Sequence, residues 1–300
     1  MAEALSVVED AQLLAVASRG QTAADAFAQK WDVPRAYAGY DRLLADPDID
    51  IVYVATPNAM HRENILAALD AGKHVLCEKP MTTSAADSQY CADYAAARDL
   101  FLMEAMWTAF FPAMQMAVDM IAAGAIGKPR HLTASFVSYR NPREFPNLFD
   151  PALGGGAALD LGIYPITIAQ LLGGPIVSLS SQTVRGQNGV DEMTVVSGRH
   201  KSELLSQLSF GFRVDLPAET IVTGDAGQII ISNPCYRPEQ IVVQKAGQRE
   251  VISAPMVGNG YTHEVIEVQQ CLASGLTESR KYPAAISVGT ALLMEEILRV

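Results

Sequence analysis

The sequence predicts an α/β protein with a Rossmann-type, doubly wound parallel sheet and a C-terminal α+β domain with a large, mainly antiparallel open sheet. In the first hundred residues, short apolar runs alternate with helical stretches. Strands joined in this way pair in parallel through right-handed crossovers. From Arg130 onward, many short β-like segments are separated by Gly, Asn, Asp and Pro, which is typical of antiparallel strands. The 300 residues suffice for about two domains, and we expect them to be 1–110 and 111–300.

The expected elements of the first domain follow in chain order. The apolar run 12–17 predicts a strand buried on both faces. Residues 23–31 predict a helix with Thr22 as its N-cap and Pro34 just past its end. Three further strands are expected over residues 51–55, 74–77 and 101–104, and the helices between them over 61–71 and 84–98.

Polar groups follow three of these strands. They are Ser18-Arg19, Thr56-Pro57-Asn58 and Glu78-Lys79-Pro80. Each group alone is equally explained as a chain turn, because Pro and Asn are common in turns. Ligands of doubly wound sheets bind at the carboxyl ends of the strands, so the three groups together favour a nucleotide crevice.

A nearly continuous apolar segment follows Gly154-Gly155-Gly156, and Asp160 is its only charged residue. A carboxylate in such surroundings needs a partner or a function. Asp160 and Tyr164 are four residues apart, which places both on one face of a helix. They could simply satisfy one another at the domain boundary. With Lys79 nearby, they would instead form a proton-transfer group, in which the ammonium lowers the pKa of the tyrosine from about 10.

Composition excludes several classes of function. The net charge is −11, with 22 Lys+Arg against 33 Asp+Glu, and this field opposes nucleic-acid binding. The scattered positions of the 4 Cys and 5 His lead us to expect neither a disulfide nor a metal site. We find no apolar window long enough for a membrane span and no secretion signal, so we expect a cytoplasmic protein without a membrane partner.

The chain resembles a known family through an ordered set of motifs. They are VATPN, AGKHVLCEKP, FLMEAMWTAFFPA, FDPALGGGAALDLGIYPI and YTHEVIEVQQCLASG. These strings, spread between Leu13 and Leu298, resemble the glucose-fructose oxidoreductase / inositol dehydrogenase (Gfo/Idh/MocA) family. Within it they look most similar to the branch of dimeric dihydrodiol dehydrogenases and NADP-dependent D-xylose 1-dehydrogenases.

The resemblance implies an NAD(P)-dependent oxidoreductase acting on a hydroxyl-bearing carbon of a sugar or a trans-dihydrodiol. It implies that Tyr164 is the acid/base, that Lys79 contacts the nicotinamide ribose and the substrate, and that Asp160 positions the reacting groups. Trp107 and Phe110 would line the substrate pocket, although each could equally be a core aromatic. It also implies a homodimer or homotetramer formed through the C-terminal sheet.

The resemblance also assigns the first domain to dinucleotide binding and the second to substrate binding. The expected cofactor contacts are Ser18, Arg19, Thr56, Pro57, Asn58, His61, Glu78 and Lys79. No carboxylate follows the first strand, where NAD-specific folds bind the ribose. Ser18 and Arg19 suit a 2′-phosphate instead, so we expect NADP rather than NAD.

Two features depart from the family pattern. Relatives begin with a central strand and a G-x-G-x-x-G turn, which are absent here, so we expect the parallel sheet to open at that place. We also expect the last helix to pack back on the first domain. Ala109 stands where relatives usually have Arg. The alternative to a dehydrogenase is therefore a binding or regulatory protein with little affinity for cofactor, or an inactive truncated fragment.

Overall fold

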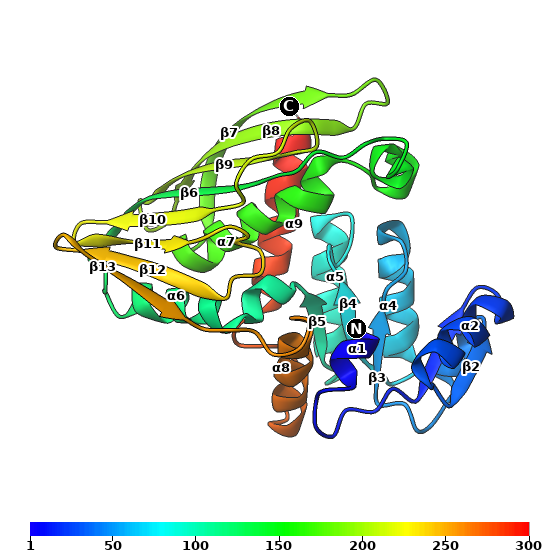
Figure 1. The fold of residues 1–300 in the computed structure, drawn as a ribbon. Helices are drawn as coiled ribbons and strands as arrows, with labels where there is room; N and C mark the ends of the chain where they lie inside the picture. The colour runs from blue at the N-terminus through cyan, green and yellow to red at the C-terminus, as the bar shows by residue number, and fades with distance from the viewer. Residues whose placement is uncertain (300) are drawn as a thin grey trace.

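The parallel strands of the first part lie in two separate sheets (Figure 1). The structure, a computed structural model, describes residues 1–299. One sheet pairs β1 (Ala15–Ser18) with β2 (Arg35–Ala38), and the other has the order β3 (Ile51–Val54), β4 (His74–Glu78), β5 (Leu102–Ala105). All of these pairs are parallel. The expected opening of the sheet thus falls between β1 and β3.

The helices of this part differ from expectation mainly at their ends. They are α1 (Ala2–Leu5), α2 (Gln21–Trp31), α3 (Asp41–Leu44), α4 (His61–Asp70) and α5 (Ala85–Ala96). The N-cap of α2 is Gly20, so the expectation that Thr22 caps this helix was wrong. The short elements β2 and α3 were not predicted from the sequence. At α5, Ser84 accepts a hydrogen bond from the N–H of Asp87 at 3.1 Å, as a helix N-cap does.

The second part is built on one eight-stranded sheet, which confirms the predicted fold class. Its order is β13-β12-β11-β10-β6-β9-β8-β7, and every neighbouring pair is antiparallel except β6 with β9. The strands are β6 (Pro129–Val137), β7 (Ile176–Arg185), β8 (Asp191–His200), β9 (Leu205–Gly211), β10 (Thr220–Gly224), β11 (Gly227–Ile231), β12 (Gln240–Lys245) and β13 (Gln248–Ser253).

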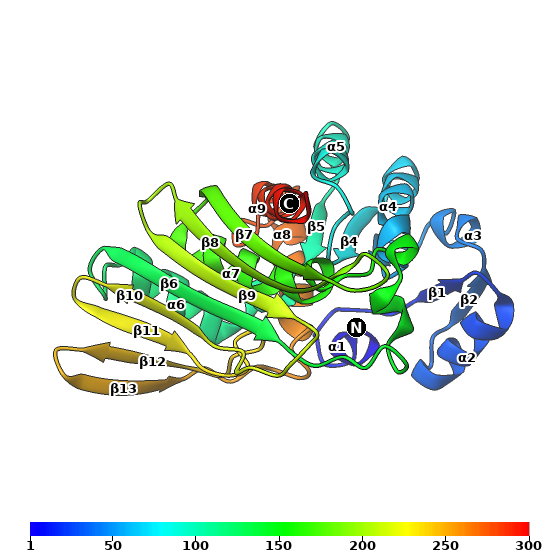
Figure 2. The ribbon, with the colours of Figure 1, turned by 90° about the horizontal axis from the view of Figure 1, so that it is seen from above.

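Helices cover only one face of this sheet. Figure 2 shows α6 (Pro112–Ala122), α7 (Ile163–Gly173) and α9 (Ala284–Leu298) on that side, while no helix of the described residues covers the other. Burial in β8 follows the same division, because Thr194 and Val196 are buried and Val195 between them is exposed. The last helix, α9, also packs against α5 of the first part. α8 (Thr262–Ala273) contacts α1.

One helical segment, Pro151–Gly173, is long and apolar enough to cross a membrane by length and composition. Our statement that the sequence holds no such apolar window was therefore wrong. In the structure, 67% of its most apolar window is buried. The segment contains a π-helical turn, Ala158–Gly162, followed by α7. Gly162 lies against the Phe210 ring, where a β-carbon would come within 2.8 Å.

Candidate active site

The segment that carries Lys79 is fixed by a buried carboxyl group. Glu104, on β5, is 3% exposed. It accepts hydrogen bonds from the main-chain N–H of Met81 at 2.7 Å and from the Tyr282 hydroxyl at 3.0 Å. Burial raises the pKa of Glu104. These bonds hold the chain just after β4, so Lys79 leaves the sheet in a defined direction.

The Lys79 side chain joins the two parts of the molecule. Its Nζ donates to the carbonyl oxygen of Asp160 at 2.9 Å and lies 3.4 Å from the carboxylate Oδ1 of the same residue. It also lies 5.1 Å from the centre of the Tyr164 ring. Burial by itself lowers the pKa of Lys79, but Tyr164, Asp160 and Glu78 together raise it. The structure thus brings together the three residues predicted to carry the chemistry, with the lysine as an ammonium.

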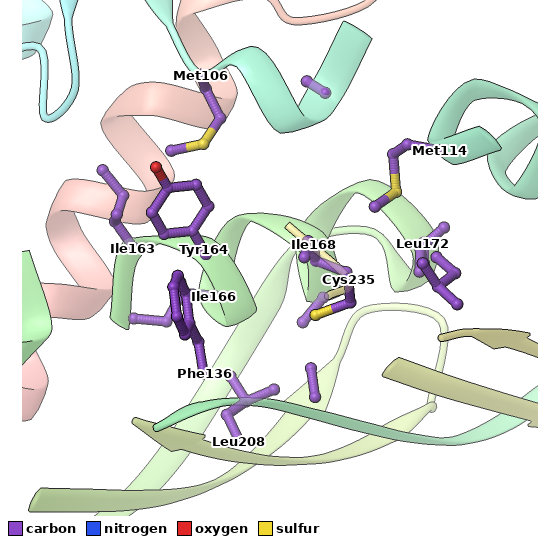
Figure 3. Close-up of a cluster of buried hydrophobic side chains, with 14 of the residues drawn as sticks. Met106, Met114, Phe136, Ile163, Tyr164, Ile166, Ile168, Leu172, Leu208 and Cys235 are labelled. Atoms are coloured by element: carbon purple, nitrogen blue, oxygen red, sulfur yellow. The ribbon is translucent and has the colours of Figure 1, made fainter. Parts of the chain in front are cut away.

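Tyr164 is 8% exposed and lies in an aromatic environment. Trp107 donates from Nε1 to its hydroxyl oxygen at 3.1 Å, and Phe136 packs edge-on against its ring at 5.4 Å. Figure 3 shows Phe136 below the ring and the hydroxyl directed toward Met106. The pKa of Tyr164 is raised, because burial outweighs the effect of Lys79. Our expectation of a lowered tyrosine pKa is therefore corrected: the ammonium acts in the predicted direction, but desolvation is larger.

Further aromatic side chains surround this pair, and sequence analysis missed them. Tyr261 stacks on Trp107 with the ring centres 4.7 Å apart. Tyr236 stacks on Phe136 at 4.3 Å and lies 6.4 Å from Trp107. Tyr236 lies between β11 and β12, and Tyr261 directly precedes α8. Single aromatics outside regular elements carry no periodic signal that could have pointed to them.

Two neighbouring positions on the short helix Trp107–Phe110 face the core. Phe110 is 5% exposed and packs edge-on against Tyr282 at 6.2 Å. The alternative of a core aromatic therefore fits Phe110 better than a place in the pocket wall. Ala109 is 0% exposed, so its side chain does not reach the surface of the site.

The loop after β3 is tied to the Lys79 segment by His61. This residue is 0% exposed, and its two ring nitrogens lie 2.8 Å from the carbonyl oxygens of Pro80 and Thr56. With both nitrogens occupied, His61 is better placed to hold the two loops than to touch a cofactor. Pro57 and Asn58 lie in the same loop, and the Asn58 side chain approaches Gly154.

The residues present fit the nicotinamide and 2′-phosphate ends of a dinucleotide better than its middle. Arg19, after β1, is exposed and forms no ion pair within residues 1–299. The carboxyl group of Glu264 is buried, and its two oxygens find no hydrogen-bond partner among the described residues; burial and the charge of Glu78 raise its pKa. Residues 1–299 contain no G-x-G-x-x-G turn between a strand and a helix to hold a pyrophosphate.

Comparison with known proteins gives a consistent result along the chain. Residues 2–106 match a family model described as an oxidoreductase family with an NAD-binding Rossmann fold, and residues 114–230 match the GFO/IDH/MocA C-terminal domain. The chain is 36% identical over 297 residues to a trans-1,2-dihydrobenzene-1,2-diol dehydrogenase of Macaca fuscata fuscata, covering 96% of this chain and 88% of that protein. The human protein of that name is 34% identical and is covered to 87%, with 95% of this chain aligned.

Solved structures support the same fold. A 3-ketoreductase from Actinomadura kijaniata, crystallised with NADP and TDP-benzene, superposes with a TM-score of 0.87 at 27% identity, covering 99% of this chain and 91% of that one. An aldose-aldose oxidoreductase from Caulobacter crescentus, 23% identical, has the same fold, with a TM-score of 0.88 over 98% of this chain and 91% of its own.

Proposed function

The chain belongs to the Gfo/Idh/MocA family of oxidoreductases, and we propose that it is an NADP-dependent dehydrogenase acting on CH–OH groups. Its substrate is a trans-dihydrodiol or a sugar such as xylose. The relatives named dihydrodiol dehydrogenases and the ketoreductase crystallised with NADP support this choice.

The observation that carries the proposal is the group formed by Lys79, Asp160 and Tyr164. A lysine from the end of a parallel strand meets a carboxylate and a tyrosine from the other part of the chain. Bound NADP would accept the hydride at its nicotinamide when the substrate is oxidised, and bound NADPH would supply it when the substrate is reduced. The protein must then hold the substrate carbon in line and exchange the hydroxyl proton.

The raised pKa of Tyr164 determines the protonation state of its phenol before the reaction. At neutral pH the phenol is protonated, so Tyr164 can donate a proton to a carbonyl oxygen during reduction. During oxidation the phenol has to lose its proton first, and the nearby ammonium of Lys79 stabilises the phenolate. We therefore assign Tyr164 as the acid/base, Lys79 as the group that stabilises its charge and contacts the substrate, and Asp160 as the group that positions Lys79.

The preference for NADP rests on the group after β1. Ser18 is the last residue of this strand and Arg19 follows it directly, and no carboxylate stands there. A guanidinium binds a phosphate through charge-assisted hydrogen bonds. Arg19 is therefore the residue we assign to the 2′-phosphate.

The aromatic side chains indicate the shape of the substrate. Trp107, Tyr236 and Tyr261 lie together beside Tyr164. Such faces pack against apolar, flat surfaces, which both a cyclic diol and the C–H face of a sugar ring present. A compact cyclic substrate with neighbouring hydroxyl groups fits this arrangement.

We also propose that the protein forms homodimers or homotetramers through the open face of the eight-stranded sheet. Within residues 1–299, no helix covers that face (Figure 2). In β8 and β9 it carries Val195, Ser197, Leu205 and Gln207, with Arg199 as the charged residue. A broad face with little charge is suited to a second copy of the chain.

A second candidate, a binding or regulatory member of the family that does not turn over substrate, is favoured by one observation: the parallel sheet is open between β1 and β3. Calorimetric titration with NADP separates the two, since micromolar binding supports the dehydrogenase and no binding supports the alternative. NADPH absorbance is then followed with a trans-dihydrodiol, D-xylose and D-glucose. Turnover with none of them would overturn the proposed activity.

A further inference from the structure

A buried carboxyl group that is not one of the three proposed catalytic residues contacts the helical segment that carries Asp160 and Tyr164. Asp191 is the first residue of β8 and is 2% exposed. Its Oδ2 accepts a hydrogen bond from the main-chain N–H of Ala158 at 2.7 Å. Ala158 opens the π-helical turn that contains Asp160, and α7 with Tyr164 follows directly.

The other oxygen of Asp191 lies against a glycine. A β-carbon on Gly156 would lie 2.3 Å from Oδ1, and the φ angle of Gly156 is +123°. The chain thus needs glycine here both for its backbone conformation and for the approach of the carboxyl group. This requirement explains one glycine of the Gly154-Gly155-Gly156 run, which sequence analysis linked only to a close approach of another surface.

The contact is made at the start of the helix, where hydrogen bonds within the helix do not hold the main chain. The first N–H groups of a helix have no partner within it, and a carboxylate near a helix start is favoured by the helix dipole. Burial raises the pKa of Asp191, although the main-chain N–H groups of Ala158 and Ala157 act against this. Asp191 therefore adds a hydrogen bond from the large sheet to the start of the helix that carries Tyr164.

We infer that Asp191 is a positioning residue, which fixes the register of the helix start and thereby the placement of Asp160 and Tyr164 relative to Lys79. The inference rests on the proposed function, because it assigns Asp191 a role in that site. Removal of its carboxyl group frees the N–H of Ala158 and lets the π-helical turn shift. A displacement of about 1 Å in a catalytic group costs about 100-fold in rate.

The test compares Asp191→Ala with Asp191→Asn and a control, Thr194→Val. Asn keeps an oxygen that can accept from Ala158. Thr194 lies on the same strand and is fully buried, and its hydroxyl pairs with that of Thr183 at 3.1 Å, so its variant perturbs β8 without removing a hydrogen bond to the helical segment within residues 1–299. We expect Asp191→Ala to lower kcat by about 10- to 100-fold with unchanged NADP affinity. Asp191→Asn should restore most of kcat, and Thr194→Val should leave it unchanged.

A second readout does not depend on turnover. The chain has 2 Trp, and in a Trp31→Phe background the emission comes from Trp107, which donates to the Tyr164 hydroxyl. We expect Asp191→Ala to change this emission in the direction that Tyr164→Phe does, while Asn and the control do not. If Asp191→Ala leaves emission and kcat as in the parent, or if all three variants lose activity alike, Asp191 has no positioning role. Absence of turnover in the parent would overturn the proposed function alone, because the emission still reports the helix position.

Discussion

Replacement of Tyr164 by Phe removes the hydroxyl that the proposed chemistry needs and one defined hydrogen bond. In the proposed chemistry the phenol exchanges the proton of the substrate hydroxyl, and loss of such a group typically costs about 10²- to 10⁴-fold in rate. The same change leaves the indole N–H of Trp107, now 3.1 Å from that oxygen, without its partner. An unpartnered donor in a partly buried place costs about 1–3 kcal/mol of stability.

These two effects can be separated by a double-mutant cycle with Trp107→Phe. Thermal unfolding of the four proteins should show that Tyr164→Phe destabilises less when the indole donor is already absent, with a coupling of about 1 kcal/mol. Assays that follow NADPH absorbance with the folded variants should show that Tyr164→Phe lowers kcat by at least about 100-fold, while the affinity for NADP is unchanged. A fall below about threefold would refute the assignment of Tyr164 as the acid/base. If the two substitutions change the free energy of unfolding additively, the hydrogen bond between the two side chains is refuted.

Three further results are expected. Arg19→Ala should weaken NADP binding by about 10-fold or more with little effect on NAD, measured by calorimetry, whereas Lys30→Ala on α2 should not. Burial alone would raise the pKa of Glu267, but hydrogen bonds from Lys281 and Ser279 lower it. The ionised side chain therefore stabilises the folded protein above the ordinary pKa of 4.5, and this contribution is lost as the pH falls through the lowered pKa. The melting temperature of Glu267→Gln should accordingly depend less on pH in the acid range than that of the parent. Leu205→Lys should shift the mass measured by light scattering toward the monomer, and an unchanged mass would remove the sheet face as the interface.

Much of the fold could be predicted because its signals are local. The strands expected over residues 51–55 and 74–77 are largely apolar runs bounded by turn residues, and the structure places β3 and β4 there with ends that differ by one residue. β2 was missed because Arg35–Ala38 is short and only partly buried, and so lacks the apolar run of a central strand. Thr22 was misjudged because helix ends vary by a residue or two, and Gly20 already has the extended backbone of an N-cap.

The sequence predicted that Lys79, Asp160 and Tyr164 come together, but it did not predict the direction of the Tyr164 pKa shift. Lys79 and Asp160 are 81 residues apart. Two observations linked them: Lys79 follows a parallel strand, where such sheets bind their ligands, and Asp160 is the only charge in an apolar segment. The direction of the Tyr164 shift depends on how deeply the fold buries the ring, which no spacing reveals. Tyr236, Tyr261 and Asp191 escaped prediction for the same reason, because tertiary packing alone brings them to the site.

The most direct test of the account follows the hydride itself. The chain is incubated with NADP and a trans-dihydrodiol or xylose deuterated at the carbon that bears the reacting hydroxyl, and the nicotinamide product is examined by mass spectrometry. We predict NADPH that carries the deuterium with the parent chain and at least about 100-fold less of it with Tyr164→Phe. Unlabelled nicotinamide from the parent chain with every substrate, or equal labelling by both proteins, would contradict it.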